Sequence, residues 1–205
     1  MNKGTLKDSK KFNLSTWSLK EIMLLVVLGS VFGVIYYLFV QLYFLLQIML
    51  GPFADLSQHI LFGSWLMVAP IAIAIIRKPF SGIFAEIMAA LIEVVVLASP
   101  FGATVFISAA IQGTGSELIF AATRYRVFSM PIFILSGFFG ALIPFIYSAL
   151  INDWINTDLF YYRLVLQLIS GVILGGVISK YTVDALRKTG VLDNFISTRP
   201  PVHDK

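Results

Sequence analysis

Three glutamates lie inside hydrophobic stretches of membrane-spanning length: Glu86, Glu93 and Glu117. Within these stretches no Lys or Arg lies beside them. An ionised carboxylate in hydrocarbon costs several kcal/mol, so intramembrane carboxylates usually face a protein interior and serve a function. The three residues therefore indicate a polar chamber inside a helical membrane protein.

The spacing of the first two glutamates favours a small-molecule ligand. Glu86 and Glu93 are seven residues apart, which returns to within about 20° on a helix of about 3.6 residues per turn. Gly82, Ala89 and Ala90 share this stripe and leave room for another group. The two carboxylates are about 10 Å apart along the axis, whereas metal ligands converge within roughly 2–2.6 Å of one ion. We therefore predict an elongated organic ligand and no metal.

A second polar stretch follows at 103–123. Gln112, near its middle, offers both amide donors and acceptors. Glu117 lies nearer the cytoplasmic end, where pairing with Arg124 or Arg126 is the alternative to a ligand contact.

Two aromatic residues complete the candidate binding site. Trp65 is either an interfacial anchor or a stacking plate for a flat heterocycle. Tyr36 offers a ring and a hydroxyl, with core packing as the alternative.

The composition dictates the class of protein that positions these residues. The chain has 205 residues, of which 58% are hydrophobic and 13% charged, and its mean hydropathy is +0.88. A soluble domain of this length needs far more charge. We predict one all-α membrane domain over 1–205, with a bundle at 21–182 and cytoplasmic tails at 1–19 and 188–205. The sequence has no cysteine, so disulfides and thiolate metal sites are excluded, and we expect no cofactor.

Six spans are predicted, at 21–46, 60–76, 80–98, 103–123, 128–150 and 161–182. With this division, fourteen of the fifteen basic residues fall on one side, and only Arg163 falls on the other. By the positive-inside rule both termini are cytoplasmic. We interpret the basic loops as determinants of membrane topology and as lipid contacts, rather than as nucleic-acid binding sites. The predicted location is the bacterial plasma membrane.

The connection at 47–59 is apolar for an outer loop, and Asp55 and His59 are its only titratable groups. We expect it either to close over the chamber as a lid or to touch lipid headgroups.

A Gly-x-x-x-Gly stripe, Gly29 and Gly33, lies on the first span. Small residues at this spacing let two helices pack closely in lipid. The partner is either another helix of this chain or a second membrane subunit.

Several motifs together resemble the YkoE family, which are substrate-binding S components of energy-coupling factor (ECF) transporters. The matching residues are Leu61-Phe62-Gly63-Ser64-Trp65, Arg77-Lys78-Pro79, Ala85-Glu86, Ala89-Ala90-Leu91, Glu93, Gln112-Gly113-Thr114-Gly115-Ser116-Glu117-Leu118 and Arg124-Tyr125-Arg126.

The resemblance implies a six-helix S component that binds thiamine or its hydroxymethylpyrimidine precursor from outside. It also implies a transmembrane coupling subunit and cytoplasmic ATPase subunits as partners. Gly29 and Gly33 stand at the spacing of the small-residue stripe with which S components contact the coupling subunit. On this basis thiamine is the expected ligand, and hydroxymethylpyrimidine or another thiamine precursor is the alternative.

Two other classes of function also use buried carboxylates. An intramembrane enzyme using the glutamates as acid and base is disfavoured, because no His-Glu-x-x-His or Gly-x-Ser-x-Gly motif occurs. A cation or proton channel, or a secondary transporter, is a more remote alternative. ATP hydrolysis requires partners, because the chain contains no Walker A motif.

Overall fold

The computed structural model describes residues 17–190, and every regular element in this part of the chain is helical. The main helices are α1 (Leu19–Leu50), α2 (Leu56–Leu61), α3 (Val68–Ile76), α4 (Ser81–Leu91), α5 (Thr104–Ala122), α6 (Met130–Ile151), α7 (Phe160–Ser170) and α8 (Ser179–Lys188). Short 3₁₀ segments are η1 (Gly51–Phe53), η2 (Phe62–Leu66) and η4 (Trp154–Asn156), and π-helical segments are η3 (Ile92–Val96) and η5 (Gly171–Ile178). The predicted tails lie mostly outside the described residues.

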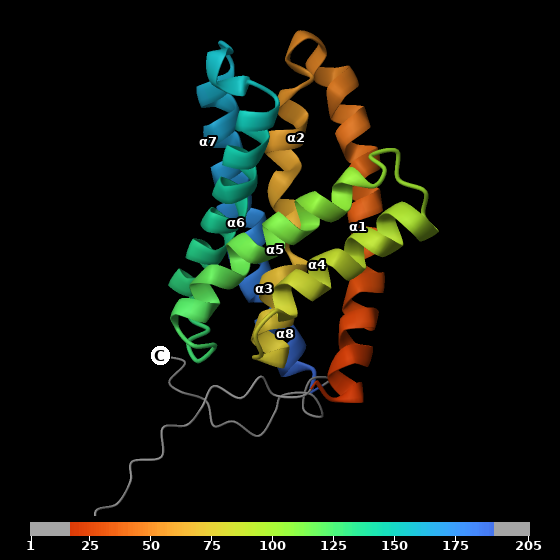
Figure 1. Ribbon diagram of the computed structural model, residues 1–205, viewed down its shortest axis with the longest axis vertical. Helices are drawn as coiled ribbons and strands as arrows, with labels where there is room; N and C mark the ends of the chain where they lie inside the picture. The colour runs from red at the N-terminus through yellow and green to blue at the C-terminus, as the bar shows by residue number, and fades with distance from the viewer. Residues whose placement is uncertain (1–16, 191–205) are drawn as a thin grey trace, which may run out of the picture.

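The six predicted spans correspond to six helical segments, because α2–η2–α3, α4–η3 and α7–η5–α8 are each nearly continuous. Five segments are long and apolar enough to cross a membrane. The sixth, α4–η3, has only 16 residues, fewer than the roughly 20 that a span requires. Figure 1 shows why it can be short: α4 and α5 run obliquely across the bundle, and the turn between them projects past α1. The six-helix fold is confirmed.

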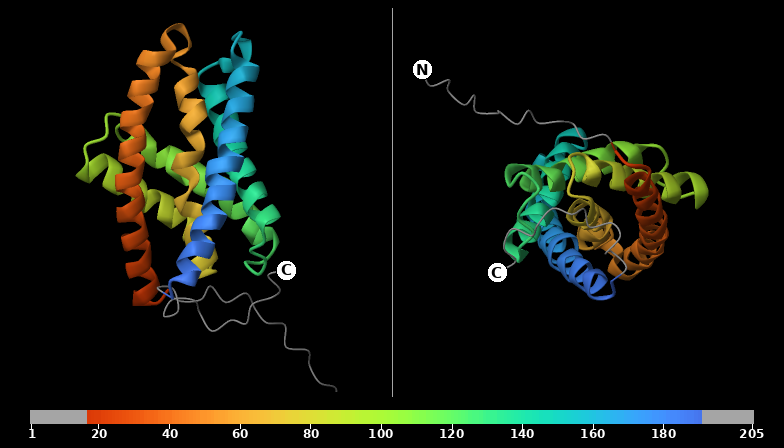
Figure 2. Two further views of the ribbon diagram at one scale, coloured as in Figure 1. Left: turned by 180° about the vertical axis from the view of Figure 1, so that it is seen from behind. Right: turned by 90° about the horizontal axis from the view of Figure 1, so that it is seen from below.

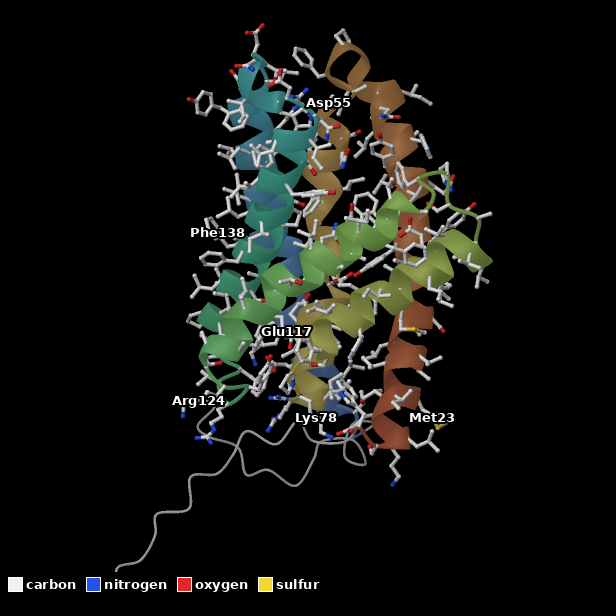
Figure 3. The ribbon with its side chains drawn as sticks, viewed as in Figure 1. Met23, Asp55, Lys78, Glu117, Arg124 and Phe138 are labelled. Carbon is white, nitrogen blue, oxygen red and sulfur yellow. The ribbon has the colours of Figure 1, made fainter. Side chains whose placement is uncertain are left out.

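The sidedness of the bundle follows from its charges. The start of α1 and the end of α8 lie at the same end of the molecule (Figure 1). Lys78 and Arg124 lie at this end and Asp55 at the opposite end (Figure 3). This separation agrees with the positive-inside assignment, which makes the end that carries Lys78 cytoplasmic.

Helix α1 begins at a capping box. The Ser18 hydroxyl accepts from the Glu21 amide at 3.3 Å, and the Glu21 carboxylate accepts from the Ser18 amide at 2.8 Å. Two backbone donors that a helix start leaves unpaired are thereby satisfied. Glu21 also forms an ion pair with Lys78 at 2.7 Å, which joins the start of α1 to the turn before α4.

Helix α3 lies at the centre of the bundle. All nine of its residues are buried, and Figure 2 shows this segment enclosed by the outer helices when seen from below. Its sequence, VAPIAIAII, is apolar on every face, as expected for a helix surrounded by protein. The 3₁₀ segment η2 directly precedes α3 and carries Trp65.

The stripe of Gly29 and Gly33 packs inside the chain. A Cβ atom added to Gly29 would lie 2.6 Å from Met88 Cβ, and one added to Gly33 would lie 2.6 Å from Ile92 Cβ and 2.9 Å from the Ala89 carbonyl oxygen. Both glycines are buried. In this structure they let α1 approach α4 and η3, which is the internal alternative; a contact with the coupling subunit stays a prediction.

We expect Gly33→Leu to lower the melting temperature of the purified protein in detergent, because the new side chain overlaps Ile92 and the backbone of Ala89. Overpacking of this kind costs about 1–3 kcal/mol. Val34→Leu is the matched control, since Val34 is 48% exposed on the same helix. Equal melting temperatures for the two variants would contradict the close packing of α1 and α4.

Candidate ligand-binding site

A cavity of about 200 Å³ lies among α1, α2, η2, α4, η3, α5 and α6. Five of the six residues that the sequence singled out for binding line it: Tyr36, Trp65, Glu86, Glu93 and Gln112. The helices that contribute them are separated by long stretches of sequence, so the bundle assembles this site. The sixth residue, Glu117, does not line the cavity.

Glu86 is 1% exposed, and its carboxylate is held by the start of α3. Its Oε1 accepts from the Ala69 amide at 3.2 Å, and its Oε2 accepts from the Tyr36 hydroxyl at 3.2 Å. The same hydroxyl accepts from the Val68 amide at 3.2 Å. Since amides at a helix start lack partners within the helix, Glu86 and Tyr36 together cap α3. The free energy gained there offsets part of the cost of burying the carboxylate.

Glu93 is also 1% exposed, but it is only half satisfied. Its Oε1 accepts from the Ser99 hydroxyl at 2.9 Å. Its Oε2 is buried and has no hydrogen-bond partner among the described residues. A buried carboxylate oxygen without a donor is costly, and Glu93 lines the cavity, so a ligand donor that reached this atom would relieve that cost.

Gln112 provides the second unengaged polar group. The side chain is 9% exposed and lines the cavity. Its amide makes no hydrogen bond to another residue of the described part of the chain. A free amide presents an oxygen acceptor next to a nitrogen donor. Glu93 Oε2 and the Gln112 amide are therefore two polar groups of the cavity lining that have no partner in the described structure.

Glu117 has a structural role that the sequence did not reveal. Its carboxylate oxygens accept from the Phe80 amide at 2.9 Å and from the Gly82 amide at 2.8 Å. It thereby caps the start of α4 from the neighbouring helix α5, where a negative charge is favoured. A Cβ on Gly82 would lie 2.7 Å from Glu117 Oε2, so the contact requires a residue without a side chain there.

Tyr125 lies near this cap and is influenced electrostatically by the Glu117 carboxylate. Burial, together with the neighbouring carboxylate, raises the pKa of Tyr125, so the hydroxyl stays protonated as a donor. The proposed ligand contact of Glu117 and its alternative pairing with Arg124 or Arg126 are both replaced by this cap in the described structure.

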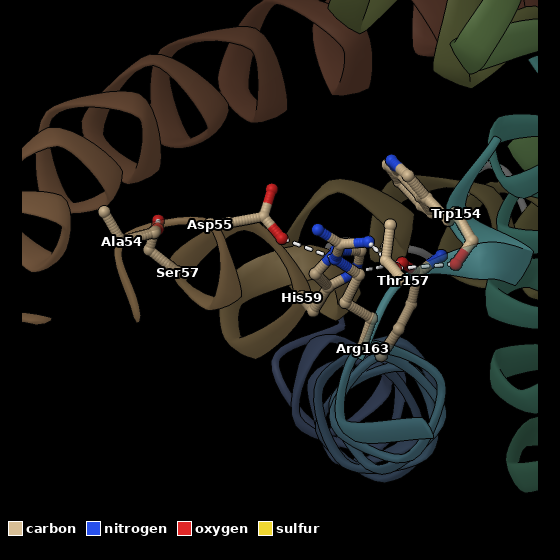
Figure 4. Close-up of polar contacts among 8 residues, drawn as sticks. Ala54, Asp55, Ser57, His59, Trp154, Thr157 and Arg163 are labelled. Carbon is tan, nitrogen blue, oxygen red and sulfur yellow. Dashed lines mark hydrogen bonds and ion pairs between the residues drawn. The ribbon is translucent and has the colours of Figure 1, made fainter. Parts of the chain in front are cut away.

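The outer segment 47–59 is mostly helical and is fastened to α7. Residues 47–50 belong to α1, and α2 begins at Leu56. Asp55 pairs with Arg163, which also donates to Thr157 at 2.7 Å and lies over the Trp154 ring (Figure 4). This network joins the segment to the far side of the bundle.

A second link lies one turn further along α2. His59 Nδ1 is 2.7 Å from Gln167 Oε1, while the Gln167 amide nitrogen donates to the Ala141 carbonyl oxygen at 3.0 Å. Gln58, which lies on the same segment, lines the cavity. Closure of the segment as a lid stays a prediction.

Sequence reasoning missed several lining residues, which are Tyr43, Gln58, Phe101, Thr104, Ser108, Tyr147 and Ser148. Most are polar or aromatic residues in stretches otherwise typical of lipid-facing or interfacial helix. A signal existed for Ser108, which shares a helix face with Gln112. For Phe101 and Tyr147 no local pattern distinguishes a cavity from lipid.

Comparisons with known proteins agree with this geometry. Residues 20–143 match a family described as "ABC-type cobalt transport system, permease component". A Bacillus subtilis (strain 168) protein named "Putative HMP/thiamine permease protein YkoE" is 36% identical over 184 residues, covering 89% of this chain and 90% of that protein. A structure titled "Crystal structure of an S-component of ECF transporter" has a TM-score of 0.80 at 35% identity, covering 88% of this chain and 90% of the other.

We expect Glu117→Ala to reduce stability by about 2 kcal/mol, because the amides at the start of α4 lose their charged acceptor. Thermal unfolding in detergent measures this loss. Ligand affinity should change little, since Glu117 does not line the cavity. Leu118→Ala is the control, as Leu118 is the next residue and is 49% exposed. A selective loss of binding at unchanged stability would contradict the capping role.

Proposed function

Because this chain belongs to the YkoE family of S components, the substrate-binding membrane subunits of ECF transporters, we propose that its cavity captures thiamine. As a member of this family it is a multi-pass membrane protein and not an enzyme, and it works with a transmembrane coupling module and an ATPase module. Its curated relative is named for hydroxymethylpyrimidine (HMP) and thiamine. The choice between these two ligands must come from the chemistry of the cavity.

The observation that carries the proposal is the pair of unengaged polar groups, Glu93 Oε2 and the Gln112 amide. An aminopyrimidine presents an amino donor beside a ring-nitrogen acceptor. A glutamine amide matches such an edge with two parallel hydrogen bonds, as it does when it reads adenine. We assign Gln112 to the pyrimidine ring on this basis.

The second ring of thiamine is a cationic thiazolium, and Glu93 supplies a buried negative partner for it. Aromatic faces stabilise cations as well, and Trp65, Tyr43, Phe101 and Tyr147 all line the cavity. With Glu86 engaged by α3, Glu93 is the carboxylate that balances the ligand charge.

The location of the cavity supports entry from outside. Gln58 near the start of α2 and Ser148 near the end of α6 both line it, and these helix ends belong to the outer half of the bundle. On the cytoplasmic side, the Glu117 cap and the buried helix α3 separate the cavity from the inner loops. Release inward therefore requires motion driven by the partner subunits.

HMP is the second candidate, and the size of the cavity favours it. A volume of about 200 Å³ lies below the roughly 300–1,000 Å³ typical of sites for drug-sized ligands. One ring fits such a space with less rearrangement than two. HMP carries the same aminopyrimidine edge but no fixed charge.

The donor set of the cavity gives no support to a metal ion as cargo, despite the cobalt-transport description of the matching family. Among residues 17–190, no group of three His, Cys, Asp or Glu side chains is placed to hold a metal. Glu86, one of the two cavity carboxylates, is occupied by Tyr36 and Ala69.

Calorimetric titration of the purified, ligand-stripped protein with thiamine and then HMP tests the proposal. Tighter binding of thiamine supports a site that uses both rings. Tighter binding of HMP makes the protein a precursor importer. If the folded protein binds neither, the substrate assignment is wrong.

Replacing Glu93 with Gln should weaken thiamine binding by about tenfold or more, because a buried ion pair with the ligand loses one partner. HMP binding should fall less, since HMP has no fixed positive charge. The ratio of the two dissociation constants is the measurement. An equal loss for both ligands would rule out charge pairing by Glu93.

Replacing Gln112 with Leu should instead weaken both ligands by a similar factor, about five- to tenfold, because both carry the aminopyrimidine edge. Oxythiamine, in which the amino group is replaced by an oxo group, should bind the wild-type protein poorly and lose little further affinity in Gln112→Leu. A thiamine-selective effect would place Gln112 at the other ring.

A further inference from the structure

The helix that carries Glu93 changes its winding at that residue. Helix α4 ends at Leu91, and η3 (Ile92–Val96) continues it as a π-helix. The Leu97 amide donates to the Ile92 carbonyl oxygen at 3.0 Å, five residues back. π-Helical turns are rare and occur frequently at functional sites. Because a π-helical turn closes its hydrogen bond over five residues instead of four, the residues after η3 lie at other positions around Glu93 than they would in a continuing α-helix.

The residue that this turn brings onto Glu93 is Ser99. The Ser99 amide donates to the Glu93 carbonyl oxygen at 3.0 Å, and the Ser99 hydroxyl donates to Glu93 Oε1 at 2.9 Å. The two residues are thus joined through both backbone and side chains. In a continuing α-helix, the residue four positions on, Leu97, would instead lie over Glu93 and could supply no hydroxyl.

The backbone around Ser99 is shaped for this contact. Ala98 has φ 53° and Gly102 has φ 66°, and a left-handed conformation is unfavourable for alanine. Phe101 holds the turn against α1, with ring centroids 5.5 Å from Tyr43 and 6.2 Å from Phe44. Ser99 is 6% exposed. The hydroxyl is therefore fixed with respect to the bundle, and it fixes the Glu93 carboxylate in turn.

We propose that Ser99 is a positioning residue for ligand binding: it engages Glu93 Oε1 and leaves Oε2 directed to a donor or cationic group of the ligand. This proposal rests on the function proposed above. A hydroxyl donor on one oxygen orients the carboxylate and supports its charged form. The other oxygen then acts as an acceptor only, which selects ligands that offer a proton donor or positive charge.

The arrangement also explains why two carboxylates on one helix differ in availability. Glu86 has partners on both oxygens, supplied by Tyr36 and Ala69. Glu93 has one donor, Ser99, and one oxygen without a partner in the described structure. Ser99 therefore contributes to affinity through Glu93 and needs no contact with the ligand itself.

A double-mutant cycle tests this role. Dissociation constants for thiamine and HMP are measured by calorimetry for the wild type, Ser99→Ala, Glu93→Gln and the double variant. We expect Ser99→Ala to weaken the tighter ligand by about tenfold, because Glu93 loses its orienting donor. In the Glu93→Gln background the same change should have less than a twofold effect, since residues that act as one unit are not additive.

Two further variants separate positioning from a general structural role. Ser99→Thr keeps the hydroxyl and should restore affinity to within about threefold of the wild type. Ser136→Ala removes a buried hydroxyl that donates to the Ser116 carbonyl oxygen on α5, away from the cavity lining, and should leave affinity unchanged. Melting temperatures of the ligand-free proteins report whether each variant is folded.

The outcomes distinguish the two proposals. Wild-type affinity retained in Ser99→Ala, or an equal loss in the wild-type and Glu93→Gln backgrounds, would overturn the positioning role while leaving the function intact. Failure of the wild type to bind either ligand would overturn both. If Ser99→Ala does not fold, Ser99→Cys serves in its place, because a thiol donates a weaker hydrogen bond and should give an intermediate affinity.

Discussion

A carboxylate buried in a membrane protein needs hydrogen-bond donors. The packing of this bundle depends on which residues supply those donors to its three buried glutamates. Two of the three buried glutamates find them at helix starts. Glu117 accepts from amides at the start of α4, and Glu86 accepts from the start of α3 and from Tyr36. Each contact also satisfies amides that have no partner within their own helix. The same pairing thus stabilises both the charge and the helix.

These caps position the rest of the bundle. Because Glu117 ties the start of α4 to α5, the two helices stay paired as they cross the molecule obliquely. Glycines allow the close approaches around them, as at Gly33, which packs on η3, and Gly82, which admits the Glu117 carboxylate. With α3 capped by Glu86, a fully buried helix fills the centre of the bundle.

The third glutamate is the exception that gives the cavity its chemistry. Glu93 lies where the helix changes to π-helical winding, and its one donor is a hydroxyl from the following turn. An incompletely satisfied carboxylate costs stability in the empty protein. In the proposed function, a donor on the ligand recovers that cost. The chain belongs to the same family as S components of ECF transporters, and this agrees with a subunit that captures a ligand and releases it when a partner subunit acts on it.

The sequence alone determined the number of helical segments and their sidedness, and it singled out five of the residues that line the cavity, because hydropathy, charge placement and helical periodicity are local properties. The tertiary structure decided which carboxylate is free. Glu86 takes its donors from residues 17 and 50 positions away, and Glu117 from one 37 positions away. No periodicity encodes such pairings. The packing of Gly29 and Gly33 on α4 and η3 is likewise visible only in the tertiary structure, since a small-residue stripe specifies close packing but not the partner that it packs against.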